Sequence, residues 1–573
     1  MIFSNLNIPK KFPFPYRPEK FAPREKKILE NFFTNYDKPV FAIYNLPQEV
    51  IGAMFSRYSR SDKSVRRLFL DEFWNSSFSQ YKLNQDKLAK ARERTDDFYK
   101  RVFAEFGDDS VIQMGSTHIA FEFVSQIAAK AIEDQRIGAS YIEKSTRYVN
   151  FGNKVGNHYL FMEVPEITHS KYSKEYKKWN DFAFDSYNKH LETVIPFLSK
   201  KYPIEKFADM DNIADQNQIE KIKKAYQRAL KAKAFDTVRV FLPTTVVTNL
   251  GAHFSGQATE NTINKMLISP YSEVRLLGEM AYEELIKISP NFLQNINSEY
   301  GKLAREYRKE IKTLQQKVSN SFSRNIKDGN DTKDVQIIDY DRDTGVKIAS
   351  QIIYTNQTKS YLSKFQILKW VRKNKKLLPK ILLLSIPNRS RPQYNRRNKL
   401  PRAFEQASLE VEFFKDFGIY RDLQRNRLSS TERLRLTPQY LEIPNEFNEP
   451  GMEEVLADYL KIHKMANSLY RKLIKDKNED IKNAAEYVTI LGHKLRFNIR
   501  TNIRQWVFFS ELRTISGGHP SYRNAMQKAV KEIIKKLPFL QSIFAKVDWV
   551  SDYGLGRMKS EISTQKALAK IKK

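Results

Sequence analysis

The chain has 573 residues, no cysteine and a formal net charge of +32. Its length predicts two or three domains, and the lack of cysteine excludes disulfides, thiolate metal sites and a cysteine nucleophile. Hydrophobic residues make up 41% of the sequence, and no apolar run approaches the roughly 20 residues that span a bilayer. We therefore expect a soluble, cytoplasmic protein with packed cores.

The basic charge has two explanations of equal weight. A strongly basic chain favours anionic partners such as nucleotides, nucleic acid or a membrane surface. The sequence is also rich in Lys, Asn, Ile and Tyr, so a biased composition accounts for the charge equally well. The eight His include no HxxxH or HxH pair, and we expect no metal site.

Apolar residues recur at helical spacing along most of the first half of the chain. In chain order, the segments expected to be helical are 45–75, 80–110, 117–136, 170–235 and 271–326. The fourth of these carries Tyr, Trp and Phe on an apolar stripe. The β-branched residues of 234–254 predict a strand, interrupted by Pro243.

The middle of the chain has a different pattern. Residues 326–355 read as a loop followed by two short alternating strands around "DRDTG". The next segment, 361–402, contains no Asp or Glu and is either a solvated linker or an anion-binding arm. After residue 402 we expect a second helical domain that runs nearly to the basic tail.

Two parts of the sequence indicate a tandem duplication. When 121–140 is laid over 411–430, the coinciding positions are Glu122 with Glu412, Phe123 with Phe413, and Ser140 with Ser430. Each copy continues with a helical stretch, a β-rich segment that contains Asn, and a closing segment with Arg, at 270–281 and 518–529. The matching order favours an ancient duplication.

Polar residues at fixed spacing follow the aligned segment in both copies. In the first copy, "IGASYIEKSTRYVNFG" (137–152) supplies Ser140, Glu143, Ser145, Arg147 and Tyr148. Together with Arg425, Arg427 and Ser430 of the second copy, they resemble the signature of the flavin-dependent thymidylate synthase family. That signature is Arg-His-Arg-x-x-Ser-x-Asn-Glu-x-Ser-x-Arg-Tyr. The first copy lacks its basic opening, which reads Gln135, Arg136 and Ile137, and the second copy has Glu432 at the Asn position.

A second family segment, Asn-x-Arg followed by Leu-Arg and a closing Arg, is also present. The second copy matches it at Asn502, Arg504, Arg513 and Arg523, with His519 where the family usually has Gln. In the first copy Asn249 and Arg275 fit, whereas Gly251 and Lys265 replace the two other arginines. The two copies therefore retain different parts of the family pattern.

The resemblance implies a chemistry and a set of partners. Family members transfer a methylene group from methylenetetrahydrofolate to dUMP and reduce it with FAD and NADPH, which gives dTMP without a cysteine nucleophile. FAD would be the cofactor, and NADPH and methylenetetrahydrofolate the co-substrates. The two-copy layout implies a homodimer that imitates the family tetramer, with one composite site between the repeats of each chain. Nucleic acid is a possible but less favoured partner, and no membrane is expected.

The resemblance also assigns roles to individual residues. The catalytic residue would be Arg513, which makes the pyrimidine a better electrophile. The substrate-binding residues would be Ser140, Arg147, Tyr148, Ser430, Arg504 and Arg523, and the cofactor-binding residues Arg425, Arg427, Asn502 and His519. Arginine suits this work because its planar guanidinium binds phosphate or a uracil edge with two parallel hydrogen bonds.

Each assignment has a structural alternative. Arg425 and Arg427 could be surface residues that pair with Asp416 or Asp422, and Arg513 could pair with Glu511 or another carboxylate. The serines could cap helices, which is the favoured role for Ser145, and Glu143 could form a solvent-facing helical ion pair with Arg147. At the level of the whole protein, the alternative is a degenerate relative that only binds nucleotide or nucleic acid.

The predicted fold is α+β, helix-rich, with long helices around a small, mainly antiparallel sheet in each of two tandem domains. The predicted divisions are an N-terminal extension (1–40), a first domain (41–290), a linker with the basic segment (291–385), a second domain (386–540) and a basic tail (541–573).

Overall fold

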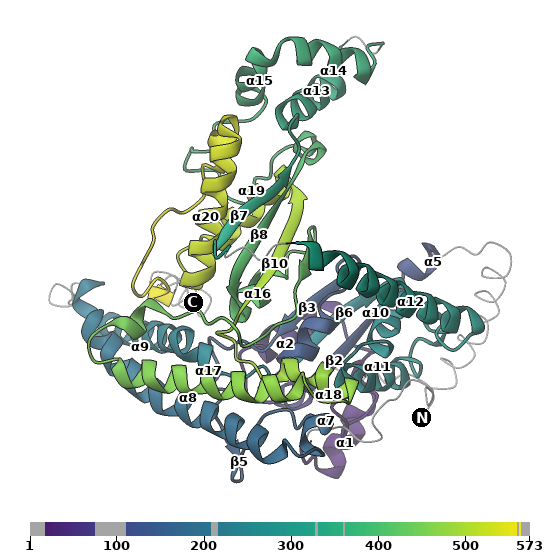
Figure 1. Ribbon diagram of the computed structural model, residues 1–573, viewed down its shortest axis with the longest axis vertical. Coiled ribbons are helices and arrows are strands. Elements are labelled where there is room, and N and C mark those ends of the chain that lie inside the picture. The colour runs from purple at the N-terminus through teal and green to yellow at the C-terminus, as the bar shows by residue number, and fades with distance from the viewer. Residues whose placement is uncertain are drawn as a thin grey trace. The chain divides into compact units, whose positions relative to one another are not determined.

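The structure is a computed structural model that describes residues 16, 18–74, 110–207, 216–326, 331–358, 361–558 and 561–562. The charged helix expected at 80–110 lies outside these residues, except for its last position. The described part is rich in helix and has small antiparallel sheets (Figure 1), which confirms the predicted fold class. Within it, no helix combines the length and apolarity needed to cross a membrane.

Two four-stranded sheets with the same strand order form the centres of the fold. The first has the order β1-β2-β6-β3, with bounds Val40–Ile43, Ser116–Ser125, Val247–Ser255 and Ala139–Glu143. The second has the order β7-β8-β10-β9, with bounds Val335–Tyr340, Ser408–Asp416, Lys494–Asn502 and Ser430–Arg433. All neighbours in both sheets are antiparallel. The repeated topology confirms the duplication.

Equivalent helices follow equivalent strands. After β2 and β8 come α6 (Gln126–Ile132) and α16 (Phe417–Leu423), and after β6 and β10 come α10 (Gly256–Leu267) and α19 (Ile503–Arg513). The next pair is α11 (Ser272–Leu285) and α20 (Pro520–Lys536). The remaining long helices are α2 (Gln48–Tyr58), α8 (Ser173–Lys201), α9 (Gln216–Val238), α12 (Glu299–Phe322), α13 (Thr344–Asn356), α14 (Lys364–Lys373) and α17 (Glu453–Leu473). Shorter helices include α1 (Pro23–Leu29), α3 (Val65–Leu68), the π-helix Phe69–Phe73, α15 (Leu378–Leu384) and α18 (Glu479–Ala484).

The chain groups into two compact units that do not follow the order of the sequence. Unit 1 contains Met1–Asn188, Phe241–Asn330 and Asp458–Ile490. Unit 2 contains Lys189–Val240, Asp331–Ala457 and Leu491–Lys573. Each unit thus takes one sheet from its own repeat and a helical segment from the other. The second sheet also takes β7 from the segment predicted as a linker.

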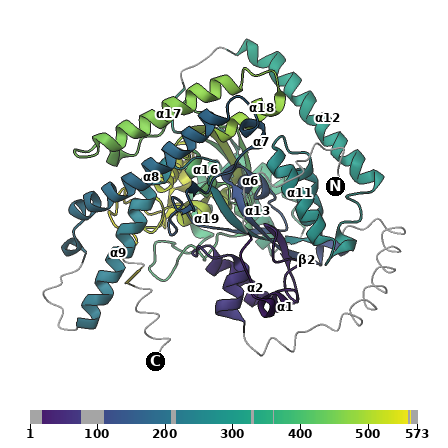
Figure 2. The same ribbon diagram turned by 90° about the horizontal axis from the view of Figure 1, so that it is seen from below.

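Unit 1 shows why a segment of the second repeat belongs with the first sheet. In unit 1 the α17 residues run beside α8, as Figure 2 shows, and the Trp179 indole N–H donates to the carbonyl of Ile462 at 3.3 Å. Lys472 forms an ion pair with Glu175 at 2.8 Å. The Trp179 side chain is fully buried. Helices α8 and α9 confirm the helical pattern predicted over 170–235 within the described residues, and the buried Trp179 belongs to its predicted aromatic stripe.

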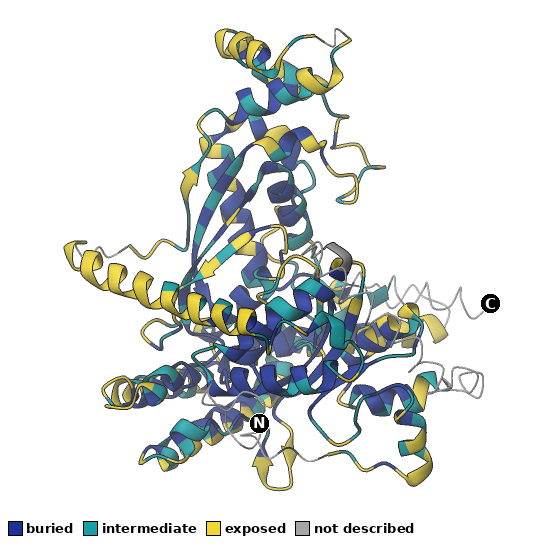
Figure 3. Cartoon of the chain, turned by 90° about the vertical axis from the view of Figure 1, so that its right-hand side faces the viewer, coloured by how far each residue is buried: buried dark blue, intermediate teal, exposed yellow. Residues whose placement is uncertain are grey.

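Two predictions of secondary structure were wrong. Residues 117–136 form β2 and the short helix α6, not one helix. Nearly every position of β2 from Thr117 to Ser125 is buried or half-buried, so the strand has the continuous apolar run that periodicity cannot distinguish from a buried helix. After β7, residues 344–356 form α13 where a second strand was expected; its buried Val346 and Ala349 pack in a small cluster with α14. Figure 3 shows the buried residues along the strands and the exposed colour of much of α12.

The strand register corrects part of the repeat alignment. Ser140 lies opposite His253, and Ser430 lies opposite Arg500; His253 and Arg500 each precede the following helix cap by two residues, so this alignment holds. In contrast, Phe121 lies opposite Leu250 as Phe413 lies opposite Phe497. Phe413 therefore corresponds to Phe121 rather than to Phe123, because β2 carries an extra, bulged residue between Phe121 and Val124.

A buried carboxylate in unit 1 makes a pH-dependent contribution to stability. Glu273 accepts hydrogen bonds from the Ser125 backbone at 2.8 Å, the Ser125 hydroxyl at 2.6 Å and the Tyr487 hydroxyl at 2.8 Å. Burial outweighs these bonds and raises the pKa of Glu273 from 4.5 to about 7.

Because the folded state then holds a proton that the unfolded state releases, the contribution of Glu273 is greatest below pH ~4.5 and is lost as the pH rises through about 7. We expect the Glu273→Gln variant, which mimics the protonated side chain, to flatten this dependence by up to about 3 kcal/mol between these limits. Urea unfolding at several pH values measures it. An equally steep loss in Glu273→Gln would contradict this origin, and Glu299→Gln, at the exposed start of α12, is the control.

Candidate functional site

The turn that follows α16 presents two arginines to solvent. Arg425 and Arg427 are both exposed, whereas Asn426 between them is buried. The Asn426 side chain accepts a hydrogen bond from Gln505 at 2.5 Å and donates one to the Ser429 hydroxyl at 2.5 Å. A buried amide thus fixes the turn, and the arginines lie just beyond the end of α16.

The carboxylates proposed as partners for these arginines have other contacts. Asp416 caps α16 by accepting the backbone N–H of Ile419 at 2.9 Å. Asp422 accepts two hydrogen bonds from Arg239, at 3.2 and 3.3 Å. Burial favours the neutral acid, but the positive charge of Arg239, with that of Arg513, outweighs it and lowers the pKa of Asp422. Asp422 is therefore ionised at the centre of a group of arginines.

Arg513 ends α19 beside this carboxylate. Its guanidinium lies 5.6 Å from the ring centroids of both Phe509 and Tyr522. Burial lowers the pKa of Arg513, Tyr522 and Asp422 oppose this, and the charge of Arg425 adds to it. The Nε atom is buried and has no hydrogen-bond partner among the described residues.

The prediction that Glu511 pairs with Arg513 is wrong. Both carboxylate oxygens of Glu511 accept hydrogen bonds from Arg389, at 2.6 and 2.7 Å, and both side chains are buried. Arg513 has no ion pair within the described part of the chain. A buried guanidinium normally needs a carboxylate or another anion to offset its desolvation. Arg239 and Arg513 lie beside Asp422, and the charge of Arg425 acts on Arg513, so this arginine cluster has the positive charge that an anionic ligand requires.

Four other predicted site residues of the second repeat are held by the protein itself. Asn502 caps α19 through the backbone N–H of Gln505 at 2.9 Å, and Arg504 pairs with Glu405 at 2.7 Å. Arg523 is 2% exposed and donates to the carbonyls of Thr514 and Val550, at 2.9 and 2.8 Å.

His519 accepts the Ser521 N–H at Nδ1 and lies 3.2 Å from the Asp236 carbonyl through Nε2. These two partners assign the neutral ring with its proton on Nε2. The observed contacts of Asn502, Arg504, Arg523 and His519 are structural, and their ligand roles stay predictions.

The predicted residues of the first repeat lie at and just after β3. Ser140 is exposed on the strand, and Ser430 occupies the equivalent exposed position on β9. Tyr148 is 42% exposed, with the guanidinium of Arg60 5.2 Å from its ring centroid. The Ser145 hydroxyl accepts the backbone N–H of Arg147 at 3.3 Å, so it stabilises a turn; the helix cap expected for it is wrong, because no helix begins at this position.

The prediction of a helical ion pair between Glu143 and Arg147 is wrong, because residues 139–143 form the strand β3. Glu143 is buried and pairs with Lys130 at 3.0 Å. The match of Asn249 to the family Asn is also wrong: Ser255 caps α10 as Asn502 caps α19, so Ser255 is the counterpart. Gln257 lies two residues after Ser255, as Arg504 lies two residues after Asn502, so Gln257 replaces the first Arg. Arg275 and Arg523 each lie four residues after the cap of the next helix, so these two arginines do correspond.

Sequence reasoning missed three residues that lie beside Asp422 or Arg513: Arg239, Arg421 and Tyr522. Arg239 ends the helical region of α9, far in sequence from Asp422, and no motif marks it. Arg421 and Tyr522 lie within the matched segments, where their spacing could have identified them. Ser140, Arg147 and Tyr148 belong to unit 1 and the cluster belongs to unit 2.

Two copies of one four-stranded sheet, with an arginine cluster in the second copy, define a tandem-repeat α+β protein. The profile of the family described as "Thymidylate synthase complementing protein" matches residues 69–291 and 337–539. The chain belongs to this family and contains two copies of its domain, which confirms the resemblance.

Three relatives match nearly the whole chain. A UPF0159 protein of Chlamydia muridarum (strain MoPn / Nigg) is 33% identical over 550 residues, which cover 94% of this chain and 98% of that protein. A UPF0159 protein of Chlamydia pneumoniae is 32% identical over 559 residues, with coverage of 95% and 98%. One of Thermoplasma acidophilum is 29% identical over 525 residues, with coverage of 89% and 97%. The matches extend over both repeats.

Proposed function

We propose that the protein is a flavin-dependent thymidylate synthase-like enzyme that converts dUMP to dTMP with methylenetetrahydrofolate, FAD and NADPH. Family membership supports the general class. The observation that carries the specific proposal is Arg513, a half-buried arginine with a buried Nε atom and no ion pair in the described structure, beside the exposed Arg425. An anionic nucleotide would offset the desolvation of this group.

The chemistry follows from what an arginine can do at such a position. A guanidinium can donate two parallel hydrogen bonds to a phosphate or to the polar edge of uracil. Held in a site of low dielectric, its charge would stabilise negative charge that develops on the pyrimidine. The rings of Phe509 and Tyr522, each 5.6 Å from the guanidinium, restrict its orientation, so little reorganisation is needed when substrate binds.

The residues present fit a flavin cofactor in part. Arg425 and Arg427 project from a turn fixed by Asn426 and would bind its phosphate groups. Asn502 and His519 are occupied as helix caps and are the weaker candidates. When bound, FAD supplies the hydride equivalents that reduce the transferred one-carbon group.

Two measurements test the proposal. Purified protein titrated with FAD should show a flavin absorption spectrum that is retained through gel filtration. With methylenetetrahydrofolate and NADPH added, it should release tritium from [5-³H]dUMP. A protein that retains no flavin and releases no tritium would contradict the proposal. Gel filtration with light scattering on the same sample tests the expected homodimer.

A second function is favoured by the internal contacts of the motif residues. Because Arg504 and Arg523 are both held by partners within the chain, the protein could bind a nucleotide without turnover. Saturable dUMP binding with no tritium release, with or without FAD, would favour this function. Nucleic-acid binding would instead weaken steeply with salt.

A further inference from the structure

Unit 1 contains a cavity of about 400 Å³ that is lined by none of the residues assigned a catalytic, substrate-binding or cofactor-binding role. It opens where β2, β3 and β6 meet the segment between α2 and α3. The lining residues are Tyr16, Glu19, Asp62, Lys63, Ser64, Glu122, Phe123, Lys144, Val149, Asn150, Phe151, Asn153, Val155, Leu160, Val247 and Asn249. The size lies within the range of small-ligand sites, and the wall combines apolar side chains with a few polar groups.

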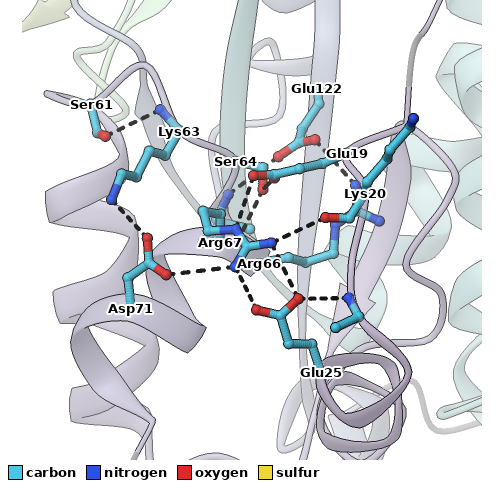
Figure 4. A network of polar contacts seen from close by, with 12 residues as sticks. Glu19, Lys20, Glu25, Ser61, Lys63, Ser64, Arg66, Arg67, Asp71 and Glu122 are labelled. Atoms are coloured by element: carbon cyan, nitrogen blue, oxygen red, sulfur yellow. Dashed lines mark hydrogen bonds and ion pairs between the residues drawn. The ribbon is translucent and has the colours of Figure 1, made fainter.

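Most of the charged groups on the wall are already paired. Figure 4 shows Glu19 and Glu122 beside Arg66 and Arg67. Glu122 accepts hydrogen bonds from the Tyr58 hydroxyl at 3.0 Å and from Arg66 at 3.3 Å. Lys63 is paired with Asp71 at 2.7 Å. These groups form the frame of the cavity and have little capacity left for a ligand.

Lys144 differs from these groups. It follows β3, and its backbone is fixed by an N–H that donates to the Asn249 carbonyl at 2.9 Å. Its ammonium forms no hydrogen bond or ion pair with a described residue. Burial lowers the pKa of Lys144, and the charges of Asp62 and Glu122 only partly oppose this. A half-buried ammonium that faces a cavity can donate to an acceptor bound there, and the described protein supplies none.

Asn249 provides a second donor. Its side-chain oxygen accepts the Phe123 backbone N–H at 3.0 Å, which leaves the amide NH₂ without an acceptor among the described residues. Phe123 is held at φ +56 in the bulge of β2, a conformation that is strained for a phenylalanine. In this conformation the Phe123 side chain lines the cavity, and its ring centroid lies 5.4 Å from that of Tyr16.

We propose that this cavity is a binding site for a small organic monocarboxylate with an apolar or aromatic body. The carboxylate accepts hydrogen bonds from the Lys144 ammonium and the Asn249 amide, and the body packs against Phe123, Phe151 and Leu160. A dianion such as a phosphate ester is disfavoured, because one ammonium faces Asp62 and Glu122 at the same cavity. The site is distinct from the arginine cluster of unit 2.

Calorimetry on the full-length protein tests the site with phenylacetate as the probe. Phenylacetate should bind saturably, whereas phenylacetamide, its neutral isostere, and phenyl phosphate, a dianion, should bind at least about tenfold more weakly. Lys144→Met should weaken phenylacetate binding by at least about tenfold. Lys63→Met, which removes an ammonium of the same cavity that is already paired, should leave it unchanged.

A second measurement needs no variant. In the wild-type protein, phenylacetate should slow acetylation of Lys144 by an amine-reactive reagent, followed by peptide mass spectrometry, and should not slow that of Lys63. Absence of saturable phenylacetate binding, equal binding by Lys144→Met, or equal binding of phenylacetamide would each overturn the proposal. Tighter binding of phenyl phosphate would overturn its monoanionic character.

Discussion

The Arg513→Ala variant should lose tritium release from [5-³H]dUMP by at least about a hundredfold and remain as stable as the wild type. The loss of activity follows from removal of the guanidinium that would bind and polarise the pyrimidine. The retained stability follows from the absence of an ion pair: truncation removes a desolvated charge and orphans no carboxylate that depends on Arg513 alone. Urea unfolding and the tritium assay, on the same preparation, measure both quantities.

The matched control is Arg372→Ala. Arg372 is an exposed arginine on α14 whose side chain pairs with Asp343 at 3.3 Å, far from the arginine cluster in sequence and with no predicted role. It should change neither quantity. If Arg513→Ala lost stability in proportion to activity, Arg513 would be a structural residue.

Truncation of Arg389 should be the most destabilising of the changes considered, at about 3–5 kcal/mol. Arg389 and Glu511 form a bidentate pair in which the side chains are 6% and 1% exposed. Burial raises the pKa of Glu511 and Arg389 opposes this, so Arg389→Ala leaves a buried carboxylate with its main partner removed. The free energy of unfolding from urea titration measures the loss.

The pH dependence of this loss identifies its cause. Without Arg389 the carboxyl of Glu511 can be buried only as the neutral acid, so the loss should be smaller at pH 5 than at pH 8. Arg391→Ala, an exposed neighbour in the same basic segment, should have little effect. A loss that is the same at both pH values would contradict the buried-charge explanation.

Arg389 also bears on the basic segment 361–402, which was expected to be a linker or an anion-binding arm. The structure contains α14 and α15 in this segment, and Val371 and Leu382 are buried there. The absence of Asp and Glu is therefore compatible with a folded structure. At least one of its arginines is an internal partner of α19 rather than a surface charge.

The sequence alone determined the family, the duplication and the α+β class, because these depend on patterns within short segments. The family motif around Ser140 and Arg147 in one copy, and the two motifs around Arg425 and around Arg513 in the other, each lie within a short segment of sequence. The same is true of the helix over 170–235. Strand β2 was not predicted, because a strand buried on both faces lacks the alternation of apolar and polar residues by which strands are recognised.

Only the tertiary structure decided which charges meet. Arg239 pairs with Asp422, which lies 183 positions later in the sequence. Glu511 pairs with Arg389 rather than with Arg513, and Lys144 lines a cavity. The tertiary structure also assigned a helical segment of each repeat to the other unit. These outcomes depend on contacts between residues distant in the chain, and the free energy of a buried charge is set by such neighbours, not by its position in a motif.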